Sequence, residues 1–251
     1  MPEHTYIITS TAANIVGAID VPVGAQKLLM ALLREQDREQ RGWITIRSVA
    51  PAERLCRRTL DVLRALGCAP RGGNARFFAR AVDALADIPD LFDNIELSRD
   101  ARILSWSFAD PFLQAMERTE AYGLIDPTEI KLLTGKWDLA LLAHIAVQRR
   151  KQYPDIRLIG GRSSGCQADE MATAYDLRRV RRPLEACLAK WAKHLGSEII
   201  VGYGQARCKP VYVSVRVRFV SKTSVWTPKT IRRFSPNTKV VRIAPPAPSH
   251  S

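Results

Sequence analysis

Apolar residues recur every three or four positions between residues 173 and 196, in the stretch TAYDLRRVRRPLEACLAKWAKHLG. At 100° per residue they share one stripe of an α-helix. The stripe consists of Leu177, Val180, Leu184, Leu188, Trp191 and Leu195. The opposite face carries Tyr175, Arg178, Arg179, Arg182, Lys190 and Lys193, and Arg181 lies at the edge of the stripe. The pattern predicts a helix with one buried side and one basic side.

Clustered arginines on the outer face of a helix suit the major groove of DNA. A guanidinium group can form two parallel hydrogen bonds, either to a phosphate or to the edge of a guanine. The simpler interpretation is a basic face that contacts only water. The distribution of charge along the rest of the chain favours the DNA interpretation.

The patterns in the first half of the chain predict helices, a strand and a hairpin. We expect an irregular arm at 1–22 with an extended piece at 6–9, helices at 24–39, 51–66 and 74–87, a strand at 42–46, and hairpin strands at 94–97 and 102–108. Arg76 and Arg80 fall on the outer side of the third helix and are candidate DNA-binding residues. The order of helix, strand, two helices and hairpin is that of a winged helix.

The same order of elements repeats after a connecting helix at 110–122 and a boundary at GLIDP. We expect helices at 137–150, 165–171 and 173–195, a strand at 156–159, and hairpin strands at 198–203 and 211–219. The tip of this second hairpin, QARCK, carries Arg207 and Lys209. In its second strand apolar residues alternate with polar and basic ones, among them Arg216 and Arg218.

These elements predict an α+β fold, mostly helical, with two tandem winged-helix domains. The expected segments are an N-terminal arm at 1–22, a first winged-helix domain at 23–122, a second winged-helix domain at 123–220 and a basic flexible tail at 221–251. We expect the second domain to be the main DNA-binding unit.

The net positive charge lies entirely in the C-terminal part of the sequence. Residues 1–150 contain 19 Lys and Arg and 19 Asp and Glu, whereas residues 151–251 contain 19 and 6. No acidic residue follows Glu198. Such asymmetry is typical of a surface that binds a polyanion. The tail can add phosphate contacts without sequence specificity, or it can serve only to keep the protein in solution.

Cysteine usage and hydropathy predict a cytoplasmic protein. The five cysteines are scattered and form no CxxC pair, which argues against a disulfide framework and a zinc ribbon. The N-terminus lacks the pattern of a signal peptide, and no apolar run is long enough to cross a membrane. No membrane partner is expected.

The sequence lacks the motifs of the common catalytic classes. No two of the four histidines are close in sequence, and there is no HExxH or GxxxxGK[ST] motif. The stretch GRSSG at 161–165 has neither the lysine of a phosphate loop nor the spacing of a nucleophile turn. We therefore expect a protein without a metal or cofactor that is not an enzyme.

The long helix carries the pattern L-R-R-V-x-x-P-L-x-x-x-L from Leu177 to Leu188. With two consecutive winged helices, this pattern resembles theta-type plasmid replication initiators, the Rep family. The resemblance covers roughly residues 24–220. It implies that the second domain binds directly repeated origin sequences in double-stranded DNA, and that the first domain binds DNA more weakly or forms a homodimer. It also implies recruitment of the host replicative helicase or initiator.

Three functions remain open on the sequence. The leading one is sequence-specific binding of double-stranded DNA that initiates plasmid replication. A winged-helix transcriptional regulator or repressor would need the same surface. A nicking relaxase would need a metal-binding histidine pair beside a tyrosine nucleophile; Tyr175 is present, but the histidine pair is not.

Overall fold

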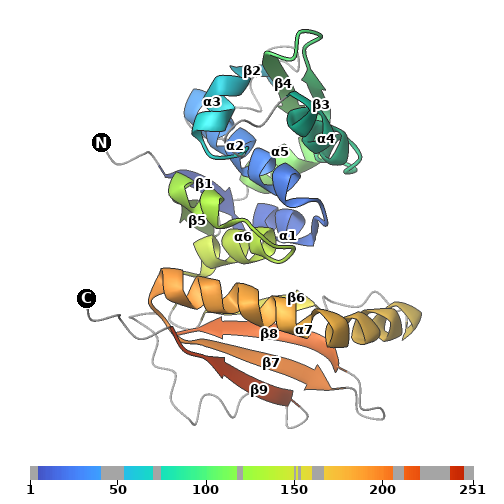
Figure 1. The fold of residues 1–251 in the computed structure, drawn as a ribbon, viewed down its shortest axis with the longest axis vertical. Coiled ribbons are helices and arrows are strands. Elements are labelled where there is room, and N and C mark those ends of the chain that lie inside the picture. Colours follow the sequence, from blue (N-terminus) through green and yellow to red (C-terminus); the bar gives the residue numbers. More distant parts are fainter. Residues whose placement is uncertain are drawn as a thin grey trace. The chain divides into compact units, whose positions relative to one another are not determined.

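The computed structural model describes residues 5–40, 54–69, 75–117, 121–149, 151, 154–159, 167–205, 212–220 and 238–245. Within these ranges it does not describe the side chains of residues 40, 159, 167–180, 205 and 212–214. The chain forms two compact units, Met1–Val147 and Gln148–Ser251 (Figure 1). Both units combine helices with antiparallel strands, so the α+β class is confirmed.

The first unit begins with strand β1 (Tyr6–Thr9) and helix α1 (Ser10–Ala18). β1 pairs antiparallel with β5 (Tyr122–Ile125), and α1 packs against α5 (Asp110–Glu117). Thr9 joins these elements because its Oγ1 accepts a hydrogen bond from Ala12 N (3.2 Å) and donates one to Ala115 O (2.6 Å). The extended piece at 6–9 is confirmed, but the segment expected to be an arm is part of the first unit.

The boundary between the units also differs from the expected one at 122/123. The connecting helix ends at Glu117, and Tyr122 already belongs to β5. After the 3-10 helix η3 (Pro127–Leu132), helix α6 (Asp138–Gln148) packs against β5. A Cβ on Gly123 would lie 2.1 Å from Ala146 C, so only glycine permits this approach. β5 and nearly all of α6 therefore lie in the first unit.

Helix α2 (Val23–Gln40) is the central element of the first unit, close to its predicted bounds. Leu28, Leu29 and Leu32 are fully buried. Glu35 is also fully buried, and its carboxylate pairs with Arg58 Nε at 2.6 Å and Arg34 Nη1 at 2.9 Å. Because a buried charge needs such partners, this cluster ties the segment around Arg58 to α2.

The prediction of a helix at 51–66 is wrong for the central residues of that segment. Cys56–Thr59 forms strand β2, and among the described residues of this segment the α-helix is limited to Leu60–Ala65, as α3. The strand is favoured because Cys56 and Arg58 lie on one side of it, where Cys56 Sγ donates a hydrogen bond to Gln36 of α2 and Arg58 pairs with Glu35. Gly67, with φ +77°, follows α3 as expected.

The remaining elements of the first unit match the prediction closely. Helix α4 (Ala75–Ala86) is followed by β3 (Phe92–Leu97) and β4 (Ile103–Phe108), which form an antiparallel hairpin. β2 pairs with β4, which gives the sheet order β2-β4-β3. The strand expected at 42–46 lies outside the described residues.

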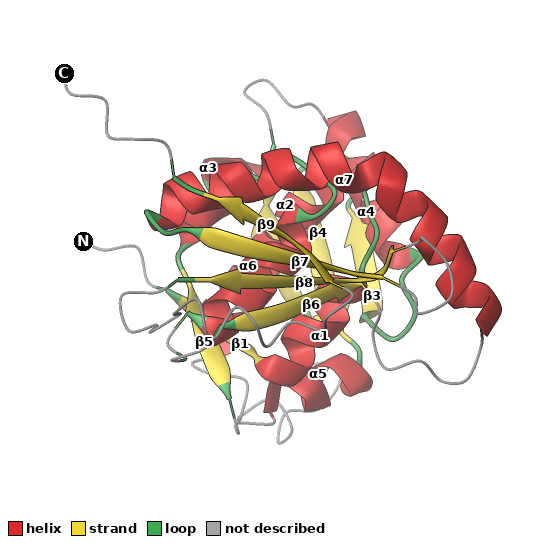
Figure 2. Cartoon of the chain, turned by 90° about the horizontal axis from the view of Figure 1, so that it is seen from below, coloured by secondary structure: helices red, strands yellow, loops and turns green. Residues whose placement is uncertain are grey.

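The second unit is a four-stranded antiparallel sheet with one long helix on one face (Figures 1 and 2). The strands are β6 (Asp155–Ile159), β7 (Ile199–Gln205), β8 (Tyr212–Phe219) and β9 (Thr238–Ile243), in the order β6-β8-β7-β9. The helix is α7 (Gln167–Leu195). Its second half buries Leu184, Leu188 and Trp191, as the apolar stripe predicts.

Two expectations for the second unit are wrong. The short helix at 165–171 and the helix at 173–195 are one continuous helix, because residues 167–182 contain no glycine or proline that would end it. The tail is not wholly flexible: β9 pairs with β7 from Gly204↔Thr238 to Ile199↔Ile243. Residues 221–237 and 246–251 lie outside the described part of the chain.

The two units share a sheet topology. In each, the strand before the long helix or helices pairs with the second hairpin strand, as β2 does with β4 and β6 with β8. The structure therefore supports the internal repeat that the order of elements predicted. The units differ where α7 replaces two helices and where β9 extends the sheet.

Candidate nucleic-acid interface

Among the described residues, the outer face of α7 carries part of the basic set that its sequence pattern predicted there. Arg182 and Lys193 are exposed on the side opposite the buried Leu184 and Leu188, and Lys190 is half-buried. Within the described part of the chain, Arg182 has no carboxylate within ion-pair distance.

Arg181, one residue away, is held by the protein itself. Its Nε donates to Glu185 Oε1 at 2.7 Å, and its guanidinium lies 5.2 Å from the centre of the Tyr203 ring. The Tyr203 hydroxyl also donates to Glu185 Oε1, at 3.1 Å. The hydrogen bond to Glu185 raises the pKa of Arg181, and burial followed by the Glu185 charge raises the pKa of Tyr203. Arg181 thus joins α7 to β7 and is less available to a ligand than Arg182.

The other predicted DNA-binding residues of this unit have side chains outside the described part of the chain. Tyr175, Arg178 and Arg179 belong to the helical backbone of α7, but their side chains lie outside the described residues. Arg207 and Lys209, predicted at the hairpin tip, also lie outside them.

A second group of basic residues lies on the face of the sheet turned away from α7. Asp155 pairs with Arg216, whose Nε lies 3.2 Å from Oδ1, and with Arg218, whose Nε lies 3.0 Å from Oδ2. Arg157 is exposed beside Arg216 in the register of β6 and β8. The alternation along β8 places Arg216 and Arg218 together, but we did not predict them as site residues. Asp155 neutralises part of their charge, and Arg218 is buried.

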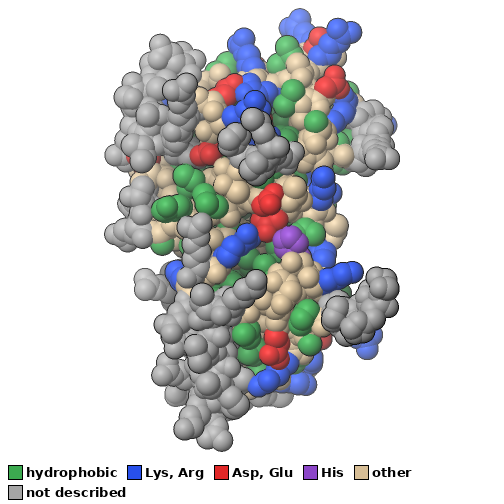
Figure 3. All heavy atoms as spheres, turned by 90° about the vertical axis from the view of Figure 1, so that its left-hand side faces the viewer, with side chains coloured by type: hydrophobic (Ala, Val, Ile, Leu, Met, Phe, Trp, Pro, Cys, Tyr) green, Lys and Arg blue, Asp and Glu red, His purple; other side chains and the backbone are tan. Residues whose placement is uncertain are grey.

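The charge asymmetry follows the observed division of the chain. Residues 1–147 contain 17 Lys and Arg against 19 Asp and Glu, whereas residues 148–251 contain 21 against 6, a net charge of +15. Figure 3 shows basic side chains at the surface of both units, with acidic ones among them. The second unit thus carries the whole positive excess.

In the first unit, Arg76 and Arg80 are exposed on α4, as predicted. They line a cavity of about 570 Å³ beside the start of α2. Arg99 and Arg102 are exposed at the turn of the β3–β4 hairpin and were not among the predicted site residues. Both belong to the stretch SRDAR, a pattern that marked the turn but not a site.

His144 is half-buried in α6, and burial lowers its pKa. Among the residues whose structure is described, no cluster of His, Cys, Asp and Glu could hold a metal ion. In the same residues, no helix is both long and apolar enough to cross a membrane.

Comparison with known proteins gives one informative result. No protein-family model matches the chain, and no curated protein matches it in sequence. Among solved structures, the chain is similar to the Pi initiator protein, which was crystallised in complex with iteron DNA. The TM-score is 0.52 at 12% sequence identity, and the match covers 88% of this chain and 99% of the Pi chain.

The chain shares the fold of a plasmid initiator. Because the match extends over nearly the whole Pi chain, it includes both units and not a single small domain. At 12% identity the similarity concerns the fold alone, so individual residues of Pi are not transferred to this sequence.

Proposed function

We propose that this chain is a sequence-specific double-stranded DNA-binding protein that initiates plasmid replication at repeated origin sequences. The observation that carries the proposal is the exposed basic face of α7 in a unit of net charge +15, within a fold shared with an initiator that binds iteron DNA. A face of this kind suits phosphate and guanine recognition.

In this proposal the two units are winged helices. The helix before the hairpin, α4 in the first unit and α7 in the second, is the one expected to enter the major groove. Positions 175 to 182 of α7 span about 10 Å at 1.5 Å per residue, a length that fits one major-groove segment. Arg182 would then contact a base edge or a phosphate, while Arg181 positions α7 against β7.

The first unit has a different role in the proposal. Its charge is slightly negative overall, so it binds DNA weakly or forms a homodimer. Recruitment of a host replicative helicase or initiator follows from the family resemblance. We further propose that the protein acts without catalytic chemistry. If supercoiled origin DNA and Mg²⁺ gave a covalent adduct that Tyr175→Phe abolishes, the relaxase alternative would replace this view.

The decisive experiment is protection mapping on the DNA that flanks the gene of this protein. We expect protection of several directly repeated sequences, because an initiator binds an array of iterons. Protection of one palindromic site that overlaps a promoter would favour a transcriptional repressor instead. Uniform weak protection along the fragment would contradict sequence-specific binding altogether.

A further inference from the structure

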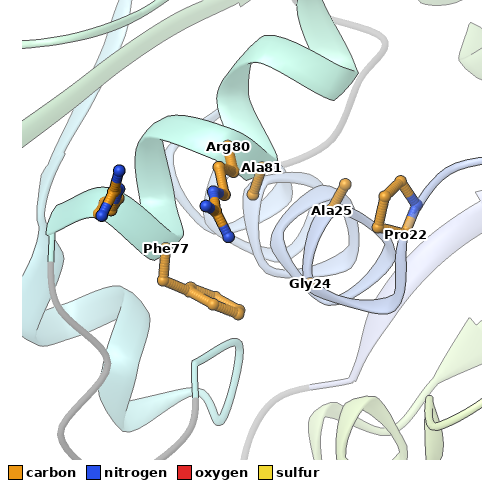
Figure 4. Close-up of a pocket in the computed structure, with 7 residues that line it drawn as sticks. Pro22, Gly24, Ala25, Phe77, Arg80 and Ala81 are labelled. Carbon is orange, nitrogen blue, oxygen red and sulfur yellow. The ribbon is translucent and has the colours of Figure 1, made fainter.

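The cavity between α2 and α4 has the size of a small-ligand site. Its volume is about 570 Å³, within the range of roughly 300–1,000 Å³ typical of such sites. Figure 4 shows it at the junction of the two helices. The residues that line it are Pro22, Gly24, Ala25, Arg76, Phe77, Arg80 and Ala81.

One side of the cavity is cationic. Arg76 and Arg80 lie one turn apart on α4, so their Cβ atoms are about 5–6 Å apart, and like charges at this spacing repel. Within the described residues neither guanidinium has a carboxylate at ion-pair distance. The other wall is the first turn of α2, where Gly24 and Ala25 lie at the positive end of the helix. An anion between these walls would relieve the repulsion of the two arginines.

The rest of the cavity is apolar and aromatic. Phe77 extends beneath the start of α2, and Arg80 reaches toward its ring (Figure 4). A Cβ on Gly24 would lie 2.8 Å from the ζ carbon of Phe77, so the ring rests directly on the glycine backbone. Pro22 and Ala25 complete this apolar wall. The arrangement therefore combines two phosphate-binding groups with a surface for a flat ring.

We propose that this cavity binds a free nucleoside phosphate, with its phosphates between Arg76 and Arg80 and its base against Phe77. Arginine favours phosphate through paired hydrogen bonds, and an aromatic side chain stacks with any base. The bases of a duplex are already paired and stacked and cannot enter. The site is therefore separate from the duplex-binding face of α7 and goes beyond the proposed function.

The test is calorimetric titration of the full chain with ATP, adenosine and tripolyphosphate. We expect ATP to bind more tightly than either fragment, because each fragment uses only one part of the cavity. Arg76→Gln and Arg80→Gln should each weaken ATP binding roughly tenfold or more, through loss of a charge-assisted hydrogen bond. Arg38→Gln removes an exposed arginine of α2 outside the cavity and should change nothing.

Gly24→Ala tests the proposed base contact independently of the phosphate contacts. Its methyl group displaces the tip of the Phe77 ring, a movement a side chain can make at small cost to stability. It should weaken ATP and adenosine and leave tripolyphosphate unchanged. Equal affinities for ATP and tripolyphosphate would overturn the base contact, and no binding of ATP at millimolar concentration would overturn the site.

A single-stranded oligonucleotide offers the same phosphates and bases as a free nucleoside phosphate, so it tests which of the two occupies the cavity. If it binds through Arg80 while free ATP does not, the cavity belongs to a DNA-binding surface and the proposal is overturned. Protection of the origin DNA is measured on the same variants. Duplex binding that persists in Gly24→Ala, a change on α2, while ATP binding is weakened supports a separate site, so failure here is distinguishable from failure of the proposed function.

Discussion

Leu184→Ala tests how α7 is held on its sheet. Leu184 is fully buried on the side of α7 that contacts β8. Truncating a buried leucine to alanine lowers the free energy of unfolding by about 2–5 kcal/mol, because apolar contacts are lost and a cavity remains. In a domain of roughly this size each kcal/mol lowers the melting temperature by about 4–8 °C. We therefore expect a decrease of at least about 8 °C.

The assay is thermal unfolding of the full chain followed by tryptophan fluorescence, to which fully buried Trp191 contributes from the second unit and Trp106 from the first. Lys193→Ala is the matched control, because this exposed change should alter the free energy of unfolding by no more than about 0.5 kcal/mol. DNA affinity of Leu184→Ala should be normal at temperatures where the variant is folded. An unchanged melting temperature, or loss of binding by the folded variant, would refute this account of α7.

Three further predictions concern other parts of the chain. Tyr203→Phe removes the hydroxyl that donates to Glu185 and should cost about 1 kcal/mol in chemical denaturation, with DNA affinity unchanged; a large loss of affinity would mean that the hydroxyl contacts DNA. Deleting residues 238–251 removes β9 and should lower the melting temperature, whereas Lys239→Gln with Arg242→Gln keeps the strand and should not; equal effects would show that β9 contributes only charge. Because burial lowers the pKa of His144 in the folded state, the unfolded state binds more protons below about pH 6.5, so stability should fall on acidification through that range. His144→Gln should reduce this slope in denaturation curves at several pH values, and an unaltered slope would exclude His144 as its cause.

Long periodic segments were predictable from the sequence. α2 and α4 begin and end within about two residues of their expected bounds, and the β3–β4 hairpin forms where alternation and turn residues indicated it. The buried face of α7 follows from the spacing of Leu184, Leu188 and Trp191. In these elements local pattern and tertiary packing favour the same structure.

The errors arose where distant contacts determine the structure. The sequence of β2 predicts part of a helix. In the structure its Arg58 instead forms an ion pair with the buried Glu35 of α2, more than twenty residues away. The sequence of β9 predicts a polar tail because its partner strand β7 is distant: Val240 pairs with Gly202, 38 residues earlier. The boundary was misplaced because β1 and β5, at opposite ends of the first unit, form one sheet. No local window contains these pairings.

The candidate site was predictable in outline but not in detail. The helical wheel placed Arg182 and Lys193 on the outer face, and the structure agrees. The i,i+4 spacing allows an ion pair between Arg181 and Glu185. The helical wheel could not show that Tyr203 of β7 contacts both residues. Nor could it show the cavity at Arg76 and Arg80, which requires the start of α2 to lie against α4.

Comparison of Arg182→Ala with Arg181→Ala shows whether the outer face of α7 recognises DNA bases, as proposed. Affinity for the protected origin repeat and for random DNA of equal length is measured at one salt concentration. Arg182→Ala should lose about 1–3 kcal/mol on the repeat and less on random DNA, which lowers the specificity ratio. Arg181→Ala should change that ratio little, because Glu185 already holds this side chain. An unchanged ratio in a folded Arg182→Ala variant would contradict base recognition by this residue.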